Sequence, residues 1–383
     1  MSKLKLLLGC LLCVLSLTGC WNSKDIQNMA YVTALGLDYQ DGKYITYVQV
    51  LNFSNVAKTE NSQIGNVIPV WIGRGEGKTV TESFNAIYAT SQIRVFWGHV
   101  KAIVCTENIL HRGDRMKEAY DMLNRYREIR YNILLYGTKE PLQDIFAQKS
   151  ILNLSPLDTI MYTPAQIFSQ RSYILPVYGF KLIAQYNEAG NPAMLPSLTI
   201  DKEGWREDYK VKSMLKINGA YFFRKQQMIG WLSESDLQGY RWLQRKLERS
   251  PIMIPNERNP SAAVVLLHPT AKIKPVFENG KPYYNIRLKI EAYLDELAKE
   301  IPEKEIEKQA SKVVEQQIRY TYKKGLQIRS DVLKLDQSLY REYPDKWHEL
   351  HQSREFILEE DSLKQIHVQV ELLHTGKYKG RQN

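Results

Sequence analysis

Hydrophobic positions along the first half of the chain repeat mainly with the two-residue period of β-strands. Runs rich in apolar and β-branched residues predict strands over residues 29–37, 44–51, 67–72, 99–105 and 131–136. The dipeptide Asp41-Gly42 separates the first two runs and is typical of a two-residue hairpin turn. Apolar positions spaced three and four residues apart predict helices over residues 79–92, 114–127, 141–149 and 174–187.

The second half of the chain repeats this mixture of strands and helices. Residues 212–224 and 227–232 predict a hairpin that turns at Lys225-Gln226, and a helix is predicted to begin at Ser233. Three prolines and few apolar residues over 250–260 are typical of a linker. Beyond it, the pattern predicts strands over 263–268, 272–277, 283–294 and 366–372, a long helix over 303–324, and short helices over 331–342 and 344–351.

Two of the C-terminal elements have the clearest periodicity. The long helix has one apolar stripe, formed by Ile306, Ala310, Val313, Val314 and Ile318. In the last strand, apolar residues at 366, 368, 370 and 372 alternate with polar ones. The fold class predicted for the whole chain is α+β, with three consecutive α+β domains that contain mixed or antiparallel sheets and packed helices. The domains are residues 20–195, a small middle domain over 196–250, and residues 261–383 after a linker over 251–260.

Residues 1–19 differ from the rest of the chain. Two lysines precede an apolar stretch over 6–17, which is shorter than the ~20 residues that a membrane-spanning helix needs. This is the pattern of a secretory signal peptide. It ends in Leu17-Thr-Gly-Cys20, the apolar–small–small–cysteine order of a lipoprotein processing site. We expect cleavage before Cys20 and attachment of a diacylglyceryl lipid to its thiol; the alternative is an ordinary signal peptide that happens to end in cysteine.

Lipid attachment predicts a location on the extracytoplasmic face of the cell membrane, because two acyl chains give stable anchoring. The net charge of +10 then fits a domain held beside anionic lipids, and nucleic acid is not an expected partner there. Of the four cysteines, two lie in the signal peptide and Cys20 carries the lipid. Cys105 therefore has no disulfide partner within the mature chain, and its apolar surroundings predict a buried structural thiol.

A glycine-rich segment, Gly73-Arg-Gly-Glu-Gly-Lys-Thr79, is similar to a phosphate-binding loop between a strand and a helix. Such a loop has four residues between its first glycine and the Gly-Lys-Thr sequence. Gly73 lies one residue too close, so nucleotide binding is not predicted. The glycines are interpreted instead as allowing positive φ in a tight strand–helix turn.

The remaining polar residues predict neither catalysis nor metal binding. His99 has no recognisable nucleophile and carboxylate partner, so it is interpreted as a structural histidine. His348 and His351 can share a helix face, but no third ligand accompanies them, and a solvated face is predicted. The acidic run Glu359-Glu-Asp361 is interpreted as a solvated turn. No catalytic residue, metal or cofactor is assigned, and an enzyme is not expected.

Several short motifs occur in a fixed order along the chain. They are GCWNSKDI at 19–26, ALGLD at 34–38, GRGEGKT at 73–79, WGHVK at 97–101, GAYFF at 219–223 and GWL at 230–232, followed by the region 331–347 and a last strand ending in Thr375-Gly376. In this order they resemble the C-subunit lipoproteins of spore germinant receptors, the Ger(x)C family. The resemblance covers nearly all of the mature chain. Asn22 and Lys24 depart from the more acidic character expected beside the anchor.

The resemblance implies a three-domain α+β lipoprotein in the inner membrane of the spore, needed for germination. It implies a complex with the A and B membrane subunits of a receptor that responds to small nutrients, and a role in assembly rather than catalysis. The alternative is a lipoprotein solute-binding subunit of a membrane transporter. Such a protein binds its ligand between two lobes, so a deep cleft between lobes would favour this alternative.

Overall fold

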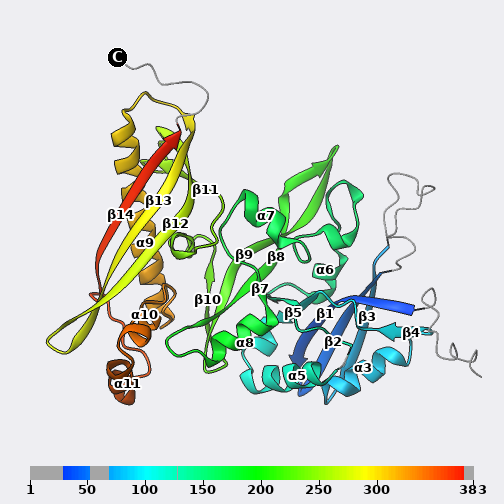
Figure 1. The fold of residues 1–383 in the computed structure, drawn as a ribbon. Coiled ribbons are helices and arrows are strands. Elements are labelled where there is room, and N and C mark those ends of the chain that lie inside the picture. The colour runs from blue at the N-terminus through cyan, green and yellow to red at the C-terminus, as the bar shows by residue number, and fades with distance from the viewer. Residues whose placement is uncertain (1–28, 52–68, 127, 375–383) are drawn as a thin grey trace, which may run out of the picture.

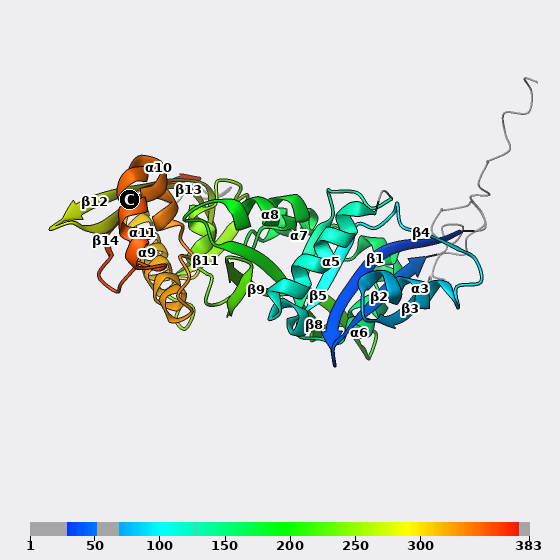
Figure 2. The ribbon, with the colours of Figure 1, turned by 90° about the horizontal axis from the view of Figure 1, so that it is seen from below.

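The protein consists of two units in an elongated arrangement (Figures 1 and 2). A computed structural model describes residues 29–51, 69–126 and 128–374. The strands form one ten-stranded sheet, from elements between residues 29 and 233, and one four-stranded sheet near the C-terminus. The fold is α+β with more than one domain, as predicted. The signal peptide and Cys20 lie outside the described residues.

The ten-stranded sheet has the strand order β10-β9-β8-β6-β5-β1-β2-β3, with β4 beside β1 and β7 beside β6. The strands are β1 (Met29–Gln40), β2 (Lys43–Leu51), β3 (Trp71–Gly77), β4 (Arg94–Phe96), β5 (Ala102–Thr106), β6 (Leu134–Thr138), β7 (Val177–Tyr178), β8 (Ala193–Glu207), β9 (Lys210–Arg224) and β10 (Gln227–Ser233). Strands β1, β5, β6 and β8 are parallel at its centre. Antiparallel strands extend the sheet at both ends.

Helices cover both faces of this sheet. They are α3 (Val80–Tyr88), α4 (Glu107–Leu110), α5 (Gly113–Arg125), α6 (Leu142–Ala147), α7 (Pro164–Gln170) and α8 (Gly179–Asn187). Helices α3, α5 and α8 pack their apolar residues on one face, whereas α6 packs on the other. The central strands are therefore buried on both faces, which explains their nearly continuous apolar runs. Cys105 of β5 is fully buried, and burial raises its pKa to about 12, as expected for a structural thiol.

The hairpin turns predicted from the sequence are confirmed. Asp41 and Gly42 have φ angles of 50° and 79°, and Lys225 and Gln226 have φ angles of 47° and 68°. Two consecutive positive φ angles are typical of the turn that matches the right-handed twist of paired strands. These turns join β1 to β2 and β9 to β10.

The glycine-rich segment does not form the predicted turn. Residues 73–77 belong to β3, and the glycines there do not have positive φ. Helix α3 lies directly over the strand, so that a Cβ atom on Gly75 would be 2.0 Å from the carbonyl oxygen of Ser83. A Cβ atom on Gly77 would be 2.6 Å from the backbone nitrogen of Ser83. The glycines therefore allow a close approach of helix and strand rather than an unusual backbone conformation.

The middle segment does not form a separate sheet. The boundary predicted between residues 195 and 196 falls inside β8. Strand β8 pairs with β6, and β9 and β10 continue the same sheet. The helix predicted from Ser233 is instead a series of turns followed by the 3₁₀ helix η4 (Tyr240–Leu243). The boundary was wrong because the pairing of β6 with β8 joins residues some 60 positions apart, as in the pair Gly137 and Ser197.

The predicted linker over 251–260 also contains a strand. Residues Ser250–Ile254 form β11, which pairs with the first part of β12 (Ala262–Glu278). Ile252 and Ile254 are buried in the C-terminal core, and this burial outweighs the composition that suggested a linker.

The C-terminal unit contains a four-stranded sheet of order β11-β12-β13-β14. Its other elements are β13 (Lys281–Leu297), α9 (Glu303–Gln327), α10 (Leu335–Glu342), α11 (Pro344–Ser353) and β14 (Leu363–His374). The two strands predicted over 263–268 and 272–277 are one strand, with an irregularity between Leu267 and Thr270. The apolar stripe of α9 is buried along its whole length, as predicted. In β14, residues 366, 370 and 372 are buried and 367, 369 and 371 are exposed, which confirms the alternation.

Helix α9 also contacts the outer edge of β14. This strand lies at the end of the sheet and pairs in parallel with β13. The backbone N–H of Val370 donates to Ser311 Oγ at 3.3 Å, and that of Leu372 donates to Glu307 Oε1 at 2.9 Å. Side chains of α9 therefore satisfy backbone donors that a neighbouring strand would otherwise bind.

Candidate functional site

Cys20 is the one site residue predicted from the sequence, and it lies outside the described residues. Its lipidation stays a prediction. In the part of the chain that the structure describes, no helix combines the length and apolar character needed to cross a membrane.

His99 lies among aromatic rings at the edge of the N-terminal core. Its ring centroid is 5.0 Å from that of Tyr31 and 5.7 Å from that of Phe96. Burial, and then the positive charges of Arg130 and Lys101, lower the pKa of His99. These contacts agree with the interpretation of His99 as a structural residue.

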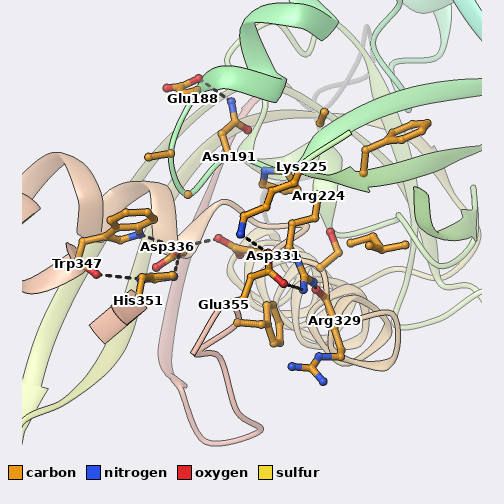
Figure 3. A pocket seen from close by; sticks show the side chains of 18 of the residues that line it. Glu188, Asn191, Arg224, Lys225, Arg329, Asp331, Asp336, Trp347, His351 and Glu355 are labelled. Carbon is orange, nitrogen blue, oxygen red and sulfur yellow. Dashed lines mark hydrogen bonds and ion pairs between the residues drawn. The ribbon is translucent and has the colours of Figure 1, made fainter. Parts of the chain in front are cut away.

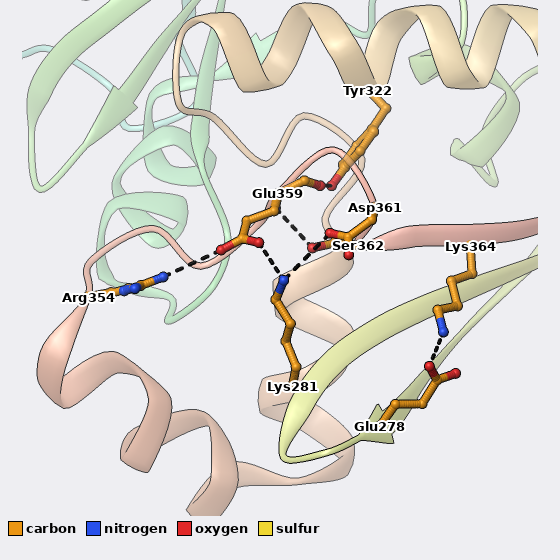
Figure 4. Close-up of polar contacts among 8 residues, drawn as sticks. All are labelled: Glu278, Lys281, Tyr322, Arg354, Glu359, Asp361, Ser362 and Lys364. Atoms are coloured by element: carbon orange, nitrogen blue, oxygen red, sulfur yellow. Dashed lines mark hydrogen bonds and ion pairs between the residues drawn. The ribbon is translucent and has the colours of Figure 1, made fainter.

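The acidic run over 359–361 forms a largely exposed turn, as predicted, and two of its carboxylates also form ion pairs (Figure 4). Lys281 Nζ lies 2.5 Å from a carboxylate oxygen of Glu359 and 3.7 Å from one of Asp361. Arg354 lies 3.4 Å from the other oxygen of Glu359. The Tyr322 hydroxyl donates to the Glu359 carbonyl oxygen at 2.5 Å. The run therefore joins the segment before β14 to α9 and to the start of β13.

His351 does not lie on the solvated helix face that its spacing from His348 predicts. Its side chain is only 12% exposed, its ring stacks on Trp347 at a centroid distance of 4.0 Å, and its Nε2 lies 3.2 Å from Asp336 Oδ2. Burial disfavours the charged imidazolium, but the hydrogen bond and charge of Asp336 outweigh it and raise the pKa of His351. Across residues 29–51, 69–126 and 128–374, no three metal-ligating side chains gather into a site.

A cleft of about 770 Å³ lies between the two units (Figure 3). The N-terminal unit contributes the end of α8, the loop from α8 to β8, and the turn between β9 and β10. The C-terminal unit contributes the connection between α9 and α10, together with α11 and the segment after it. The volume falls within the range of small-molecule sites.

Polar contacts join the two units at the rim of the cleft. Lys225 of the β9–β10 turn lies 2.9 Å from Glu355, and Arg224 lies 3.7 Å from it. Elsewhere on the rim, Arg341 of α10 lies 2.9 Å from a carboxylate oxygen of Glu188, which follows α8. These pairs are partly exposed, so each contributes little to stability alone. Together they bring the two walls of the cleft into contact.

Two carboxylates lie deep in the cleft. Asp336 Oδ2 accepts a hydrogen bond from Trp347 Nε1 at 2.9 Å, in addition to its contact with His351. Asp331 Oδ2 accepts one from the backbone N–H of Asp336 at 2.7 Å. Burial, and then the negative charge of Asp336, raise the pKa of Asp331 to about 7.

Sequence reasoning missed this pair of carboxylates. The two residues belong to a region that the sequence predicts only as a short helix, and no spacing motif marks them. The loop that faces them is distant in the sequence: a Cβ atom on Gly190 would lie 3.0 Å from the Asp336 backbone. Only tertiary packing brings these groups together.

The chain is similar in sequence to spore germination proteins. The chain is 24% identical over 366 residues to spore germination protein KC of Bacillus subtilis (strain 168), covering 89% of this chain and 88% of that protein. It is 21% identical over 357 residues to spore germination protein B3 of the same organism, covering 88% and 89%. The crystal structure of the GerBC protein shares the fold, with a TM-score of 0.52 and 16% identity over 91% of this chain and 100% of that one.

Two family models match consecutive parts of the chain. The N-terminal domain of spore germination proteins matches residues 22–200, and the "Spore germination B3/GerAC like, C-terminal" domain matches residues 218–376. The interval between the two matches falls within β8 and β9, inside the ten-stranded sheet. The matches cover both units of the fold in order, as the sequence resemblance indicated, and the chain belongs to the GerAC-like family of spore germination proteins.

Proposed function

We propose that this chain is the C subunit of a nutrient germinant receptor, required for spore germination. The observation that carries the proposal is the match of both family domains over residues 22–200 and 218–376. The relatives named above are matched over nearly 90% of their own length. The similarity therefore extends over the whole protein, and the proposed role does not depend on a single shared domain.

The chain acts by assembly with the A and B membrane subunits, at the extracytoplasmic face of the spore inner membrane. The predicted lipid on Cys20 supports this, because an anchored protein meets membrane partners at a high effective concentration. The cleft between the units is a feature that a transporter's solute-binding subunit would share. The family matches and the fold of the GerBC protein support the receptor role instead.

Two cysteine variants test the anchor and the role together. In a spore-forming host that lacks its own copy, Cys20→Ala is expected to lose radioactive palmitate labelling and the germination response to nutrients. Cys13→Ala is the matched control, because this residue lies in the predicted signal peptide, and it should retain both. Equal labelling of the two variants would contradict lipidation at Cys20.

Deletion of the gene tests the role in germination independently of the lipid anchor. A deletion strain that germinates normally in response to every nutrient would contradict the receptor role, whatever the labelling shows. Affinity purification of the tagged chain from detergent-solubilised spore membranes should recover both membrane subunits, and recovery of neither would contradict assembly.

A further inference from the structure

The open face of the C-terminal sheet carries a cluster of basic side chains. The inner face of this sheet packs on α9 through buried apolar residues of β13 and β14, so the alternate residues of these strands point away from the helix. On the open face, Lys272 of β12 is opposite Arg287 of β13, and Arg287 is opposite His367 of β14. Two further exposed lysines, Lys274 and Lys289, lie on the same face, each two positions along its strand from a member of this row.

This arrangement works against the stability of the sheet. Side chains directly opposite each other on adjacent strands have Cβ atoms about 4.5–5.5 Å apart, and like charges at such positions repel. In the part of the chain that the structure describes, neither the two lysines of β12 nor Arg287 and Lys289 form an ion pair with a carboxylate. Two acidic residues of this face, Glu291 and Glu371, are opposite each other, and Glu291 pairs with His268 at 3.0 Å. The cluster therefore keeps a net positive charge that an external anionic group can neutralise.

The composition of the face indicates the kind of anionic partner. The core of an interface between two proteins is usually rich in aromatic residues and poor in lysine. None of the exposed large apolar side chains of the described residues belongs to 270–274, 285–289 or 365–369, which form the centre of this face. A broad, basic face without such anchors fits the headgroup layer of an anionic membrane, where each lysine or arginine strengthens binding about fivefold.

The position of the face determines how the chain lies on such a membrane. Cys20, the predicted lipid attachment site, is nine residues before Met29, a segment that can span at most about 30 Å. Strand β1 begins beside β4, which lies at one end of the molecule, whereas β12, β13 and β14 lie at the other end (Figures 1 and 2). A chain anchored near β4 therefore brings its basic face to the lipid only when its long axis lies along the bilayer.

We propose that the open face of the C-terminal sheet binds the anionic surface of the membrane and holds the chain lengthwise against it. Lys272, Arg287 and Lys289 contact lipid phosphate groups, while the anchor holds the opposite end of the molecule. The choice of a membrane as the partner rests on the proposed lipid anchor, whereas the basic face itself follows from the strand register.

Vesicle co-sedimentation tests this face separately from the anchor. The mature chain without lipid, residues 21–383, contains every element that the structure describes, so any binding comes from its own surface. In about 0.1 M salt we expect it to bind phosphatidylglycerol vesicles at least about tenfold more tightly than phosphatidylcholine vesicles, and to be released in about 1 M salt. Because the assay requires neither Cys20 nor germination, its failure would leave the receptor role untouched.

Two double variants locate the binding surface. Arg287→Gln with Lys289→Gln removes two charges from the basic face and should weaken binding to phosphatidylglycerol by about tenfold or more. Lys304→Gln with Lys312→Gln is the matched control, because these lysines are exposed on α9, on the other side of the sheet, and the net charge changes by the same amount. Screening at this salt concentration should keep the effect of the control within about twofold.

Several results would overturn the proposal. They are equal binding to the two kinds of vesicle, equal losses in the two double variants, and no binding to phosphatidylglycerol at millimolar lipid. Binding of polyglutamate under conditions where the phosphatidylglycerol vesicles do not bind would indicate an acidic protein segment as the partner, and would also overturn it. If Arg287→Gln with Lys289→Gln does not fold, Lys272→Gln with Lys274→Gln should give the same loss, and full binding by that pair would count against the face.

Discussion

Gly75 is predicted to be a position where even one methyl group is not tolerated. In Gly75→Ala the new Cβ would lie 2.0 Å from the Ser83 carbonyl oxygen and 2.8 Å from Ile87 Cγ1. Non-bonded carbon atoms normally lie about 3.5–4.0 Å apart, so α3 has to move away from β3 by roughly 1 Å or more. The perturbation therefore separates a helix from the sheet rather than straining one residue.

The expected cost follows from what α3 buries. Val80, Phe84 and Ile87 are each at most 5% exposed in the N-terminal core. Overpacking a core usually costs about 1–3 kcal/mol. Loss of the burial of one such side chain adds about 1.5–3 kcal/mol. We therefore expect Gly75→Ala to reduce the free energy of unfolding by about 2.5–6 kcal/mol, a large part of the roughly 5–15 kcal/mol typical of a folded protein.

Urea unfolding of Gly75→Ala beside Gly42→Ala separates this steric effect from a backbone effect. Gly42 has a φ angle of 79° and no neighbouring atom within 4 Å of an added Cβ, so its substitution costs only about 1–2 kcal/mol in backbone strain. Tryptophan fluorescence suits the assay, because Trp97 stacks on Phe84 of α3 at a centroid distance of 4.2 Å. If Gly75→Ala costs no more than Gly42→Ala, the packing argument is wrong.

Three further predictions concern the C-terminal unit. Val370→Asp buries an unpaired charge and should cost about 3 kcal/mol or more in urea unfolding, whereas Gln369→Asp on the exposed face should stay within about 0.5 kcal/mol; equal losses would refute the register of β14. The pKa of Asp331 is about 7 in the folded state and about 3.9 in the unfolded state. Between these values the folded state binds more protons, so the free energy of unfolding is expected to fall as the pH rises from about 4 to about 7. Asp331→Asn should flatten that decline in melting temperature, and parallel profiles would refute it. Tyr322→Phe loses a hydrogen bond to the Glu359 carbonyl oxygen and should lower the free energy of unfolding by about 1 kcal/mol. Lys281→Ala removes a partly exposed ion pair and should cost less. A larger loss for Lys281→Ala in urea unfolding would contradict this order.

The parts of the fold that the sequence predicted correctly depend on residues close together in the chain. The β1–β2 hairpin follows from Asp41-Gly42, and the long helix follows from a stripe whose members are three or four residues apart. The glycine-rich segment was misinterpreted because its conformation is set by α3 packing over it, which local composition does not encode. The boundary at 195/196 and the linker over 251–260 were wrong for a related reason, since pairing with distant strands determined both.

The candidate site shows the same limit more strongly. Asn191, Ser330 and Asp331 come from two units and line one cleft only because the loop after α8 faces the start of α10. His351 was assigned to a solvated helix face because no third metal ligand accompanies it and His348, but stacking on Trp347 and pairing with Asp336 bury it. Helical periodicity shows which residues share a face of one helix, and it does not show what a distant loop brings to that face.

The contacts between α9 and β14 have a consequence for crowding at the membrane. An open strand edge can accept a strand from a neighbouring molecule and so extend one sheet through several copies. Lipid-anchored chains, as proposed here, would be concentrated in a single plane where such encounters are frequent. Because Ser311 and Glu307 already bind the outer N–H groups of Val370 and Leu372, these two donors are not available to a strand from another copy. Neighbouring anchored copies could therefore lie close together without pairing their C-terminal sheets at this part of β14.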